Sequence, residues 1–441
     1  MDFAKKTFSI FKVDVGAHGI TYLLRIVIAG LLGPLNFGIF ALIHLIPEYS
    51  EKLLRFSIDD ASIHISGKKK YELGEIFFNS AFLMFCLSFI PIVLFLWQGE
   101  IFYKLFLKDP SVSRTWIWIT LASIPFIFLF RSVVKMLLFL EKVCLYNNLL
   151  LFVSLAGYIL GIIFIILFKA GVFGILFALA VVYFIGSIMG IQIISKLIHP
   201  KLNLRFDLIK ELFIYGLKIH IPNIFLYLHL RIDMLIVAFF LTPKDVGYYA
   251  LAVSLAEILR KIPNAVLFLL YSRASKLSVE ESKALTPKSC RNVFTILCLL
   301  SIPFYFLVKI MMSLLGKDFS PVIYPFLALI PGVIALGIGQ LLMIHFYGRG
   351  YPLTTLKPVA TGLFVNVLIN LWLIPKIGIL GAAIASSISY ILCSVLLVKL
   401  FQNKEKVSTK EILIPNVEDL KFYKKFFHSE ILKPVFYIWT K

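Results

Sequence analysis

The sequence contains twelve stretches of about 20 residues that are almost continuously apolar, which is the length that an α-helix needs to cross a membrane. Runs of this kind exclude an outer-membrane β-barrel, whose strands are short and alternate between apolar and polar residues. The mean hydropathy of +0.93 and the charged fraction of 15% exclude a soluble globular protein. We therefore predict an all-α, polytopic integral membrane protein. Its expected transmembrane helices cover residues 14–33, 37–57, 75–97, 115–139, 146–168, 171–196, 212–240, 246–270, 291–314, 323–347, 355–374 and 378–400.

The chain is basic, with 44 Lys and Arg against 24 Asp and Glu and a net charge of +20. In a membrane protein this excess indicates basic cytoplasmic loops and contact with anionic lipid headgroups, so we expect membrane lipids and no nucleic acid as partners. If the N-terminus is cytoplasmic, the cytoplasmic segments outside the predicted helices contain more Lys and Arg than the exterior ones. We therefore expect a multi-pass protein of the cytoplasmic (inner) membrane with both termini in the cytoplasm.

Two pairs of matching segments reveal an internal repeat. LGPLNFGIFAL at 32–42 matches LTPKDVGYYAL 209 residues later, where Pro34 aligns with Pro243 and Gly38 with Gly247. A second match, at an offset of 207, aligns 169–187 with 376–394. Six predicted helices separate the copies, so both halves have the same orientation. We predict a six-helix lobe over 1–200, a second over 201–401, and a basic, aromatic cytoplasmic tail over 402–441, with a substrate site between the lobes.

Charged side chains inside a membrane usually face a cavity or a partner. On the first, second, seventh and eighth predicted helices such residues share one face, as Asp14, His18 and Arg25 do on the first. Together these faces predict a mildly cationic cavity, suited to an anionic ligand such as a phosphate. The candidate substrate-binding cations are Arg25, Lys52, Lys218, Arg231 and Lys261, and the candidate ion-coupling carboxylates are Glu48, Asp233 and Glu257.

Other roles stay open for part of this set. Lys52 and Lys261 lie near helix ends, where long cations reach toward headgroups. Glu48 with Lys52, and Glu257 with Lys261, are also spaced as simple i,i+4 ion pairs. The sequence contains no phosphate loop, zinc-binding motif or nucleophile elbow. We therefore expect no catalytic residues, no metal and no cofactor beyond a coupling H⁺ or Na⁺, and hence a protein that is not an enzyme.

Three segments resemble one known family. They are the turn LLGPLNFGIFAL, the stretch 231–276 beginning RIDMLIVAFFLTPKDVGYYAL, and GILGAAIASSISY at 378–390. They resemble the polysaccharide biosynthesis proteins, or Wzx-type oligosaccharide flippases, which share a superfamily with multidrug and toxic compound extrusion transporters and lipid II flippases. The resemblance implies alternating-access export of a polyprenyl-diphosphate-linked oligosaccharide, such as an O-antigen or capsule repeat unit.

The expected partners are therefore the polyprenyl-diphosphate-linked glycan and membrane lipids, with a glycan polymerase and glycosyltransferases as further candidates. Two alternatives remain. One is a cation-coupled multidrug exporter of the same superfamily, which would prefer an acidic, aromatic cavity. The other is a membrane glycan-assembly enzyme, which would need larger exterior loops than the predicted connections provide.

Overall fold

The computed structural model describes residues 3–109, 112–274, 279–349, 351–415 and 419. All regular secondary structure among them is helical, which confirms the predicted class. Most of the predicted tail, 416–418 and 420–441, lies outside the described residues. The α-helices are α1 (Phe3–Leu54), α2 (Ile58–Gly67), α3 (Leu73–Leu87), α4 (Ile90–Phe102), α5 (Arg114–Phe139), α6 (Val143–Leu167), α7 (Gly171–Ile198), α8 (Phe206–Phe240), α9 (Pro243–Ala274), α10 (Val279–Leu315), α11 (Ile323–Gly348), α12 (Leu356–Glu405) and α13 (Thr409–Leu413), with a π-helical turn η1 (Tyr103–Leu107) and 3₁₀ turns η2 (Lys317–Val322) and η3 (Pro352–Thr355).

Nine helical segments of the described chain are long and apolar enough to cross a membrane. Two of them contain a break where the sequence predicts the end of one span and the start of another. In α1 the break is at Gly33, whose φ of 74° favours glycine, directly before Pro34. In α12 it is at Ile377 and Gly378. The helix α9, which carries Glu257 and Lys261, is not among the nine. This arrangement is compatible with twelve spans, a number that stays a prediction.

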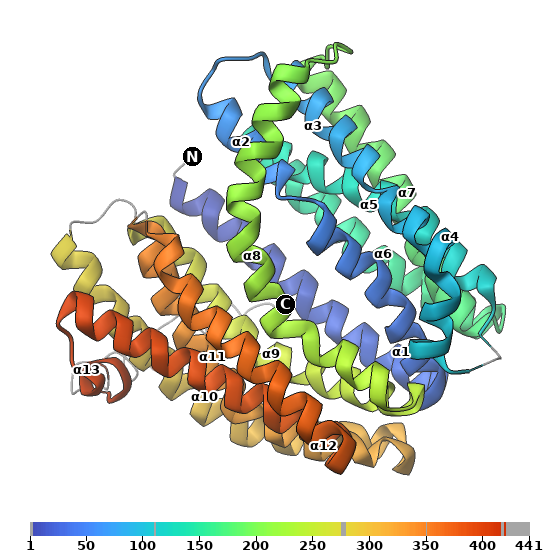
Figure 1. Cartoon of the computed structure of the whole chain (residues 1–441), viewed down its shortest axis with the longest axis vertical. Coiled ribbons are helices and arrows are strands. Elements are labelled where there is room, and N and C mark those ends of the chain that lie inside the picture. Colours follow the sequence, from blue (N-terminus) through green and yellow to red (C-terminus); the bar gives the residue numbers. More distant parts are fainter. Residues whose placement is uncertain (1–2, 110–111, 275–278, 350, 416–418, 420–441) are drawn as a thin grey trace, which may run out of the picture.

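The helices form two bodies (Figure 1). In the upper body α5, α6 and α7 pack on one another and on α1, and in the lower body α11 packs between α9 and α12 while α10 packs on α11. Large apolar side chains such as Phe40, Phe128 and Phe326 fill the interior. The two bodies meet most extensively where α1 lies against α9.

The residues aligned by the repeat lie at this meeting point and contact one another reciprocally. A Cβ atom at Gly38 would lie 1.7 Å from the carbonyl oxygen of Pro243, and a Cβ at Gly247 would lie 2.2 Å from that of Pro34. Both distances are far inside van der Waals contact, so only glycine allows this approach of the two backbones. The two helices are therefore in direct backbone contact at equivalent points of the repeat.

The helix α8 contacts both bodies and passes from the upper to the lower one (Figure 1). Its first half packs on α2 and the end of α1: Gly216 lies against the Phe56 carbonyl, and the His220 Nε2 atom is 3.0 Å from the Leu53 carbonyl oxygen. Its second half packs on α12, and Pro222 lies between the two parts. The lobe boundary at residues 200 and 201 stays a prediction, since α8 is shared by both bodies.

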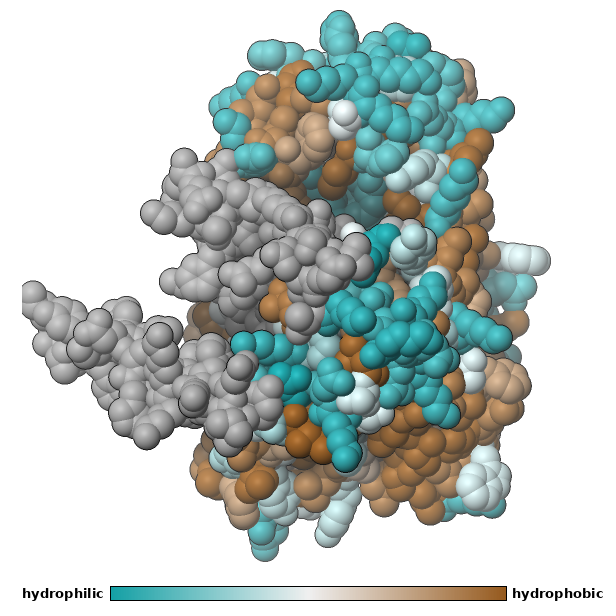
Figure 2. All heavy atoms as spheres, turned by 90° about the vertical axis from the view of Figure 1, so that its left-hand side faces the viewer, coloured by the Kyte–Doolittle hydropathy of each residue, from teal (hydrophilic) through white to brown (hydrophobic). Residues whose placement is uncertain are grey.

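One face of the molecule, on the side of α2 and α13, is hydrophilic over much of its upper part and centre and apolar over much of its lower part (Figure 2). Ion pairs join the α2–α3 connection to α8 and to the connection before it. Lys70 Nζ lies 2.9 Å from Glu211 Oε2 on α8, and Glu72 Oε2 lies 2.7 Å from Lys201 Nζ in the α7–α8 connection. A polar face beside apolar flanks fits a membrane protein that presents one end to water.

Candidate functional site

Arg231 forms the centre of an ionic cluster between the two bodies. Its Nε atom lies 3.2 Å from Oε1 of Glu48 on α1, and its Nη2 atom lies 2.7 Å from Oε1 of Glu257 on α9. The hydroxyl of Tyr22 donates to the other oxygen of Glu257 at 2.6 Å. The structure therefore brings together one predicted binding cation and two predicted coupling carboxylates, from three helices.

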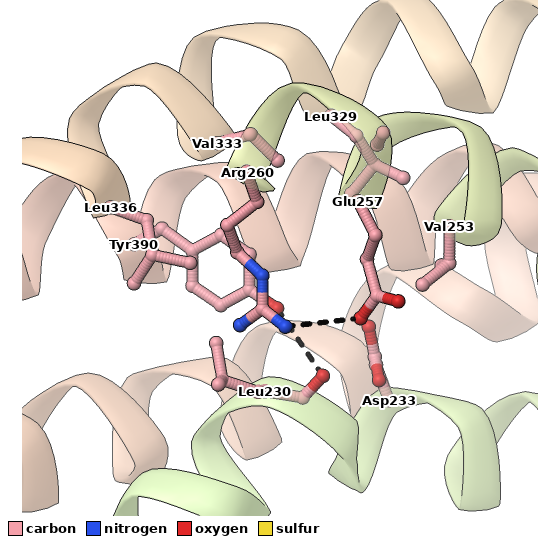
Figure 3. A pocket seen from close by; sticks show the side chains of 10 residues that line it. Leu230, Asp233, Val253, Glu257, Arg260, Leu329, Val333, Leu336 and Tyr390 are labelled. Atoms are coloured by element: carbon pink, nitrogen blue, oxygen red, sulfur yellow. Dashed lines mark hydrogen bonds and ion pairs between the residues drawn. The ribbon is translucent and has the colours of Figure 1, made fainter. Parts of the chain in front are cut away.

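Glu257 also faces a small pocket of about 30 Å³ inside the lower body (Figure 3). Arg260 points into this pocket with an Nη2 atom 3.3 Å from Glu257 Oε1, and Asp233 and Tyr390 line its other side. A volume of this size holds about one water molecule. Glu48 and Glu257 thus pair with arginines and not with Lys52 and Lys261, their i,i+4 neighbours.

Arg25 lies near this cluster without an ion partner in the part of the chain that the structure describes. Its side chain is half-buried, and its Nε atom is buried with no hydrogen-bond partner there. Glu48 and Tyr158 are close enough to interact with it electrostatically. A guanidinium with unused donors in a low-dielectric site is suited to a phosphate group. The side chains of Asp14 and His18, which share its predicted face, are outside the described set.

Asp233 belongs to a separate, fully buried polar network in the lower body. Its Oδ2 atom accepts hydrogen bonds from the hydroxyls of Tyr249 at 2.5 Å and Ser386 at 2.8 Å. Asn366 donates to Ser389 at 2.9 Å and to Ser386, and Asn370 donates to Asn366 at 2.8 Å. The carboxylate makes no ion pair with a described residue, so it keeps the capacity to exchange a proton or bind a cation.

A cavity of about 540 Å³ lies within the upper body, lined by α1, α5, α6 and α7 and by one residue of α9. We refer to it as the upper cavity. Two of the predicted binding cations, Lys52 and Lys261, line it. Three further cations line it that the sequence prediction of the binding set omits, namely Arg55, Arg131 and Lys135.

An apolar groove of about 550 Å³ lies beside the upper cavity, between α1, α9 and α10. Its lining is almost wholly apolar, and Leu300 and Leu307 on its α10 side are 44% and 50% exposed. Tyr22 and Lys261 are the polar side chains of its lining, and Lys261 Nζ lies 5.6 Å from the centre of the Tyr22 ring. Lys261 therefore lines both the groove and the upper cavity.

Lys218 lies apart from these residues. It is exposed on the first half of α8 and lines a surface pocket with Asp207 and Glu211, on the ion-paired face described above. Its predicted companion Asp233 is on the second half of the same helix, beyond Pro222. The structure thus brings Arg231, Glu48 and Glu257 together, places Lys52 and Lys261 on one cavity, and leaves Lys218 outside.

Some residues of the site lack a strong sequence signal. Arg131 and Lys135 lie one turn apart, which places them on one face of α5, but the same spacing fits contact with lipid headgroups. Asn366 and Asn370 also lie one turn apart, within an apolar span. Pairs of polar side chains at this spacing inside a span are the signal that could have identified both groups.

Comparison with known proteins supports the resemblance found in the sequence. Residues 3–274 match the family described as polysaccharide biosynthesis protein. A relative in Haloferax volcanii, a probable low-salt glycan biosynthesis flippase named Agl15, is 24% identical over 192 residues. That match covers 42% of this chain and 41% of the relative, so it spans less than half of either protein.

Two solved structures share the fold over most of their length. An inward-facing multidrug resistance MATE family transporter of the MOP superfamily has a TM-score of 0.67 at 12% identity, covering 90% of this chain and 94% of that one. The lipid II flippase MurJ, in an inward closed conformation, has a TM-score of 0.63 at 18% identity, covering 93% and 87%. The fold is therefore that of this transporter superfamily, and the chain belongs to the polysaccharide biosynthesis protein family of multi-pass membrane proteins.

Proposed function

We propose that this protein is a flippase that moves a polyprenyl-diphosphate-linked oligosaccharide across the cytoplasmic membrane, from the inner to the outer leaflet, and that it is a transporter and not an enzyme. The observation that carries this proposal is the position of Lys261. This cation lines an apolar groove on one side and a polar, cationic cavity on the other. The proposed substrate has the same order of parts, with a lipid chain, a diphosphate and a glycan.

Each part of the substrate has a matching surface. The groove offers apolar side chains to the polyprenyl chain, which could remain in contact with lipid at Leu300 and Leu307. Lys261 offers donors to the diphosphate between the two spaces, and so does Arg25, whose Nε atom has no hydrogen-bond partner among the described residues. The upper cavity, within the size range of about 300–1,000 Å³ that is usual for ligand sites, takes sugars.

The cycle that we propose is alternating access, in which the two bodies rock so that the contact between α1 and α9 is closed in one state and open in the other. Arg231 takes part because it joins carboxylates of both helices and must break or rearrange at least one ion pair when they separate. A diphosphate entering the site would compete with Glu48 and Glu257 for the arginines, which couples binding to the release of this cluster.

Asp233 is the residue that we propose for coupling to a proton or Na⁺ gradient. It is 4% exposed and accepts three hydrogen bonds, from Tyr249, Ser386 and the Met234 amide, but it forms no ion pair with a described cation. A buried carboxylate in this state is stabilised by gaining a proton or a cation. We also propose that both termini lie in the cytoplasm.

The test is complementation of a deletion strain with the full-length protein. Lipid-linked oligosaccharides are extracted and surface glycan is stained in cells that carry the wild type, Arg25→Gln, Lys261→Gln, or Lys399→Gln as a control on an exposed lysine of α12. We expect the deletion and both site variants to accumulate lipid-linked units and lose surface glycan, whereas the control restores export. Normal glycan with increased drug sensitivity in the deletion strain would instead favour the multidrug exporter. Normal export by both site variants would contradict the diphosphate assignment.

A further inference from the structure

The described charges that line the upper cavity are all of one sign. Among the described residues on its surface, five are cations and none is an Asp or Glu: Lys52, Arg55, Arg131, Lys135 and Lys261. Two of these are at or just after the end of α1 and two are on the last part of α5. Because α1 is broken at Gly33, Arg25 lies near Glu48 in the second part of the helix, and Lys52 and Arg55 are about one and two turns further along from Glu48. The cavity therefore has a cationic end beyond the position of Arg25.

The carboxylates that partner Lys52, Arg55 and Arg131 are more buried than these cations. Glu51 Oε1 is 2.9 Å from Arg131 Nε and 3.3 Å from Lys52 Nζ, and Asp59 Oδ2 is 2.9 Å from Arg55 Nη1. The Glu51 side chain is 7% exposed and that of Asp59 is fully buried, whereas those of Arg131 and Lys52 are 31% and 36% exposed. Buried carboxylates thus hold Lys52, Arg55 and Arg131 in position on the wall of the cavity.

The donors on these cations are numerous. A guanidinium carries five N–H donors and an ammonium three, and each carboxylate here engages only part of them. Among the described residues Lys135 pairs with Asp60 at 2.6 Å, and its side chain is 31% exposed. Within a membrane protein, where the local dielectric is low, such donors bind an anion more strongly than they would in water.

Aromatic side chains line the same space. Tyr146, Tyr158 and Tyr183 are on its wall together with Phe130. Tyrosine combines a flat apolar face with a hydroxyl, a combination that suits the C–H faces and hydroxyl groups of sugars. A site for phosphate or a lipid headgroup alone would not need this aromatic wall, so the lining as a whole fits a saccharide that carries negative charge.

We propose that the cationic end of the upper cavity, formed by Lys52, Arg55, Arg131 and Lys135, binds a carboxylate or phosphate substituent on the transported glycan, so that the substrate is an acidic oligosaccharide. This proposal rests on the proposed function and adds a second anion subsite to it. The diphosphate binds at Arg25 and Lys261, and the acidic sugar binds further into the upper body.

The test measures binding to the purified full-length protein in lipid nanodiscs with three probes. Trigalacturonic acid represents an acidic glycan, maltotriose is its neutral counterpart, and farnesyl diphosphate represents the lipid diphosphate. The variants are Lys135→Gln and the double variant Glu51→Gln, Arg131→Gln. The double variant removes both members of a buried ion pair, so that it does not leave the Glu51 carboxylate without its nearest partner. Arg25→Gln is the matched variant of the diphosphate subsite.

We expect the wild type to bind trigalacturonic acid at least about tenfold more tightly than maltotriose, since a charge-assisted hydrogen bond has roughly that effect. Both cavity variants should lose this preference and keep their affinity for farnesyl diphosphate, whereas Arg25→Gln should show the reverse pattern. Equal binding of the two trisaccharides, with farnesyl diphosphate still bound, overturns the acidic-glycan proposal and leaves the flippase proposal intact. Loss of farnesyl diphosphate binding in Lys135→Gln also overturns it, because the cationic end would then be the diphosphate site. If the wild type does not bind farnesyl diphosphate, the flippase proposal fails and this inference fails with it.

Discussion

Replacing Gly38 with alanine should shift the equilibrium between the two arrangements of the bodies. The new Cβ would lie 1.7 Å from the Pro243 carbonyl oxygen and 2.9 Å from the Gly247 nitrogen. Both are backbone atoms, which cannot turn away as a flexible side chain can. The first distance is about 1.5 Å or more short of normal contact, so α1 and α9 must move apart locally.

The size of the effect follows from the cost of overpacking. Inserting a methyl group into a well-packed contact costs about 1–3 kcal/mol. This penalty applies to the state in which α1 and α9 are in contact at Gly38. It does not apply to a state in which the two helices have separated at this point. A difference of about 1–3 kcal/mol corresponds to a shift of roughly 5- to 150-fold in the ratio of the two states.

Distance measurements between spin labels can detect this shift. Lys69 and Asn403 are exposed positions on the hydrophilic side, one in each body, and can be replaced by cysteine after the five native cysteines are removed. The turn between α8 and α9 lies at the opposite side of the molecule (Figure 1), so opening the α1–α9 contact should shorten the distance between the labels. Gly247→Ala should have the same effect, since its Cβ would lie 2.2 Å from the Pro34 carbonyl oxygen.

A glycine without close neighbours provides the control. No atom lies within 4 Å of a Cβ built at Gly67, at the end of α2, so Gly67→Ala should leave the distance distribution unchanged. Wild-type distributions in folded Gly38→Ala and Gly247→Ala proteins would refute the reasoning, since the contact would then tolerate a methyl group in the observed arrangement.

Three further outcomes are expected. Arg231→Met should lower the free energy of unfolding by about 3 kcal/mol, because it leaves Glu48 and Glu257 without their shared partner. Thermal unfolding measures this change, and an unchanged unfolding temperature would show that the ion pairs do not contribute to stability. Asp233→Asn should keep an acceptor oxygen for the Tyr249 and Ser386 hydroxyls but make transport in proteoliposomes independent of proton and Na⁺ gradients; transport that still follows a gradient would assign coupling to another residue. Arg291→Ala should expose the segment after α12 to limited proteolysis, since Arg291 Nε pairs with the fully buried Asp419 at 2.8 Å, and an unchanged cleavage pattern would contradict this role.

The sequence predicted the fold well because its strongest signals are local. Apolar length sets the spans, and the Gly33–Pro34 break occurs where a residue suited to positive φ precedes one that cannot donate a hydrogen bond. The repeat identified Gly38 and Gly247 as equivalent positions. The structure adds that Gly38 lies against the backbone at Pro243 and Gly247 against the backbone at Pro34. Nothing in the two matching sequence segments indicates that they are in contact.

The site was predicted less completely, because it depends on how separate helices are rotated and where they bend. A regular helix places Lys218 and Asp233 on one face, but Pro222 divides α8 between two bodies, so the two side chains lie in different surroundings. The sequence of α5 alone could not assign a role to Arg131 and Lys135, because cations on this face of the helix could contact either a cavity or lipid headgroups. Whether the cavity lies there depends on α1, α6 and α7 together.

The shared helix α8 also has a consequence for how such a protein can assemble and evolve. A six-helix unit that ended at residue 200 would leave uncovered the surface at Phe56 and Leu53 that the first half of α8 buries. The second unit, beginning at 201, would carry a half-helix with no body to pack on. Neither half is therefore a self-sufficient folding unit. A duplicated ancestor that once functioned as two separate chains would have become a single obligate protein when this helix came to belong to both.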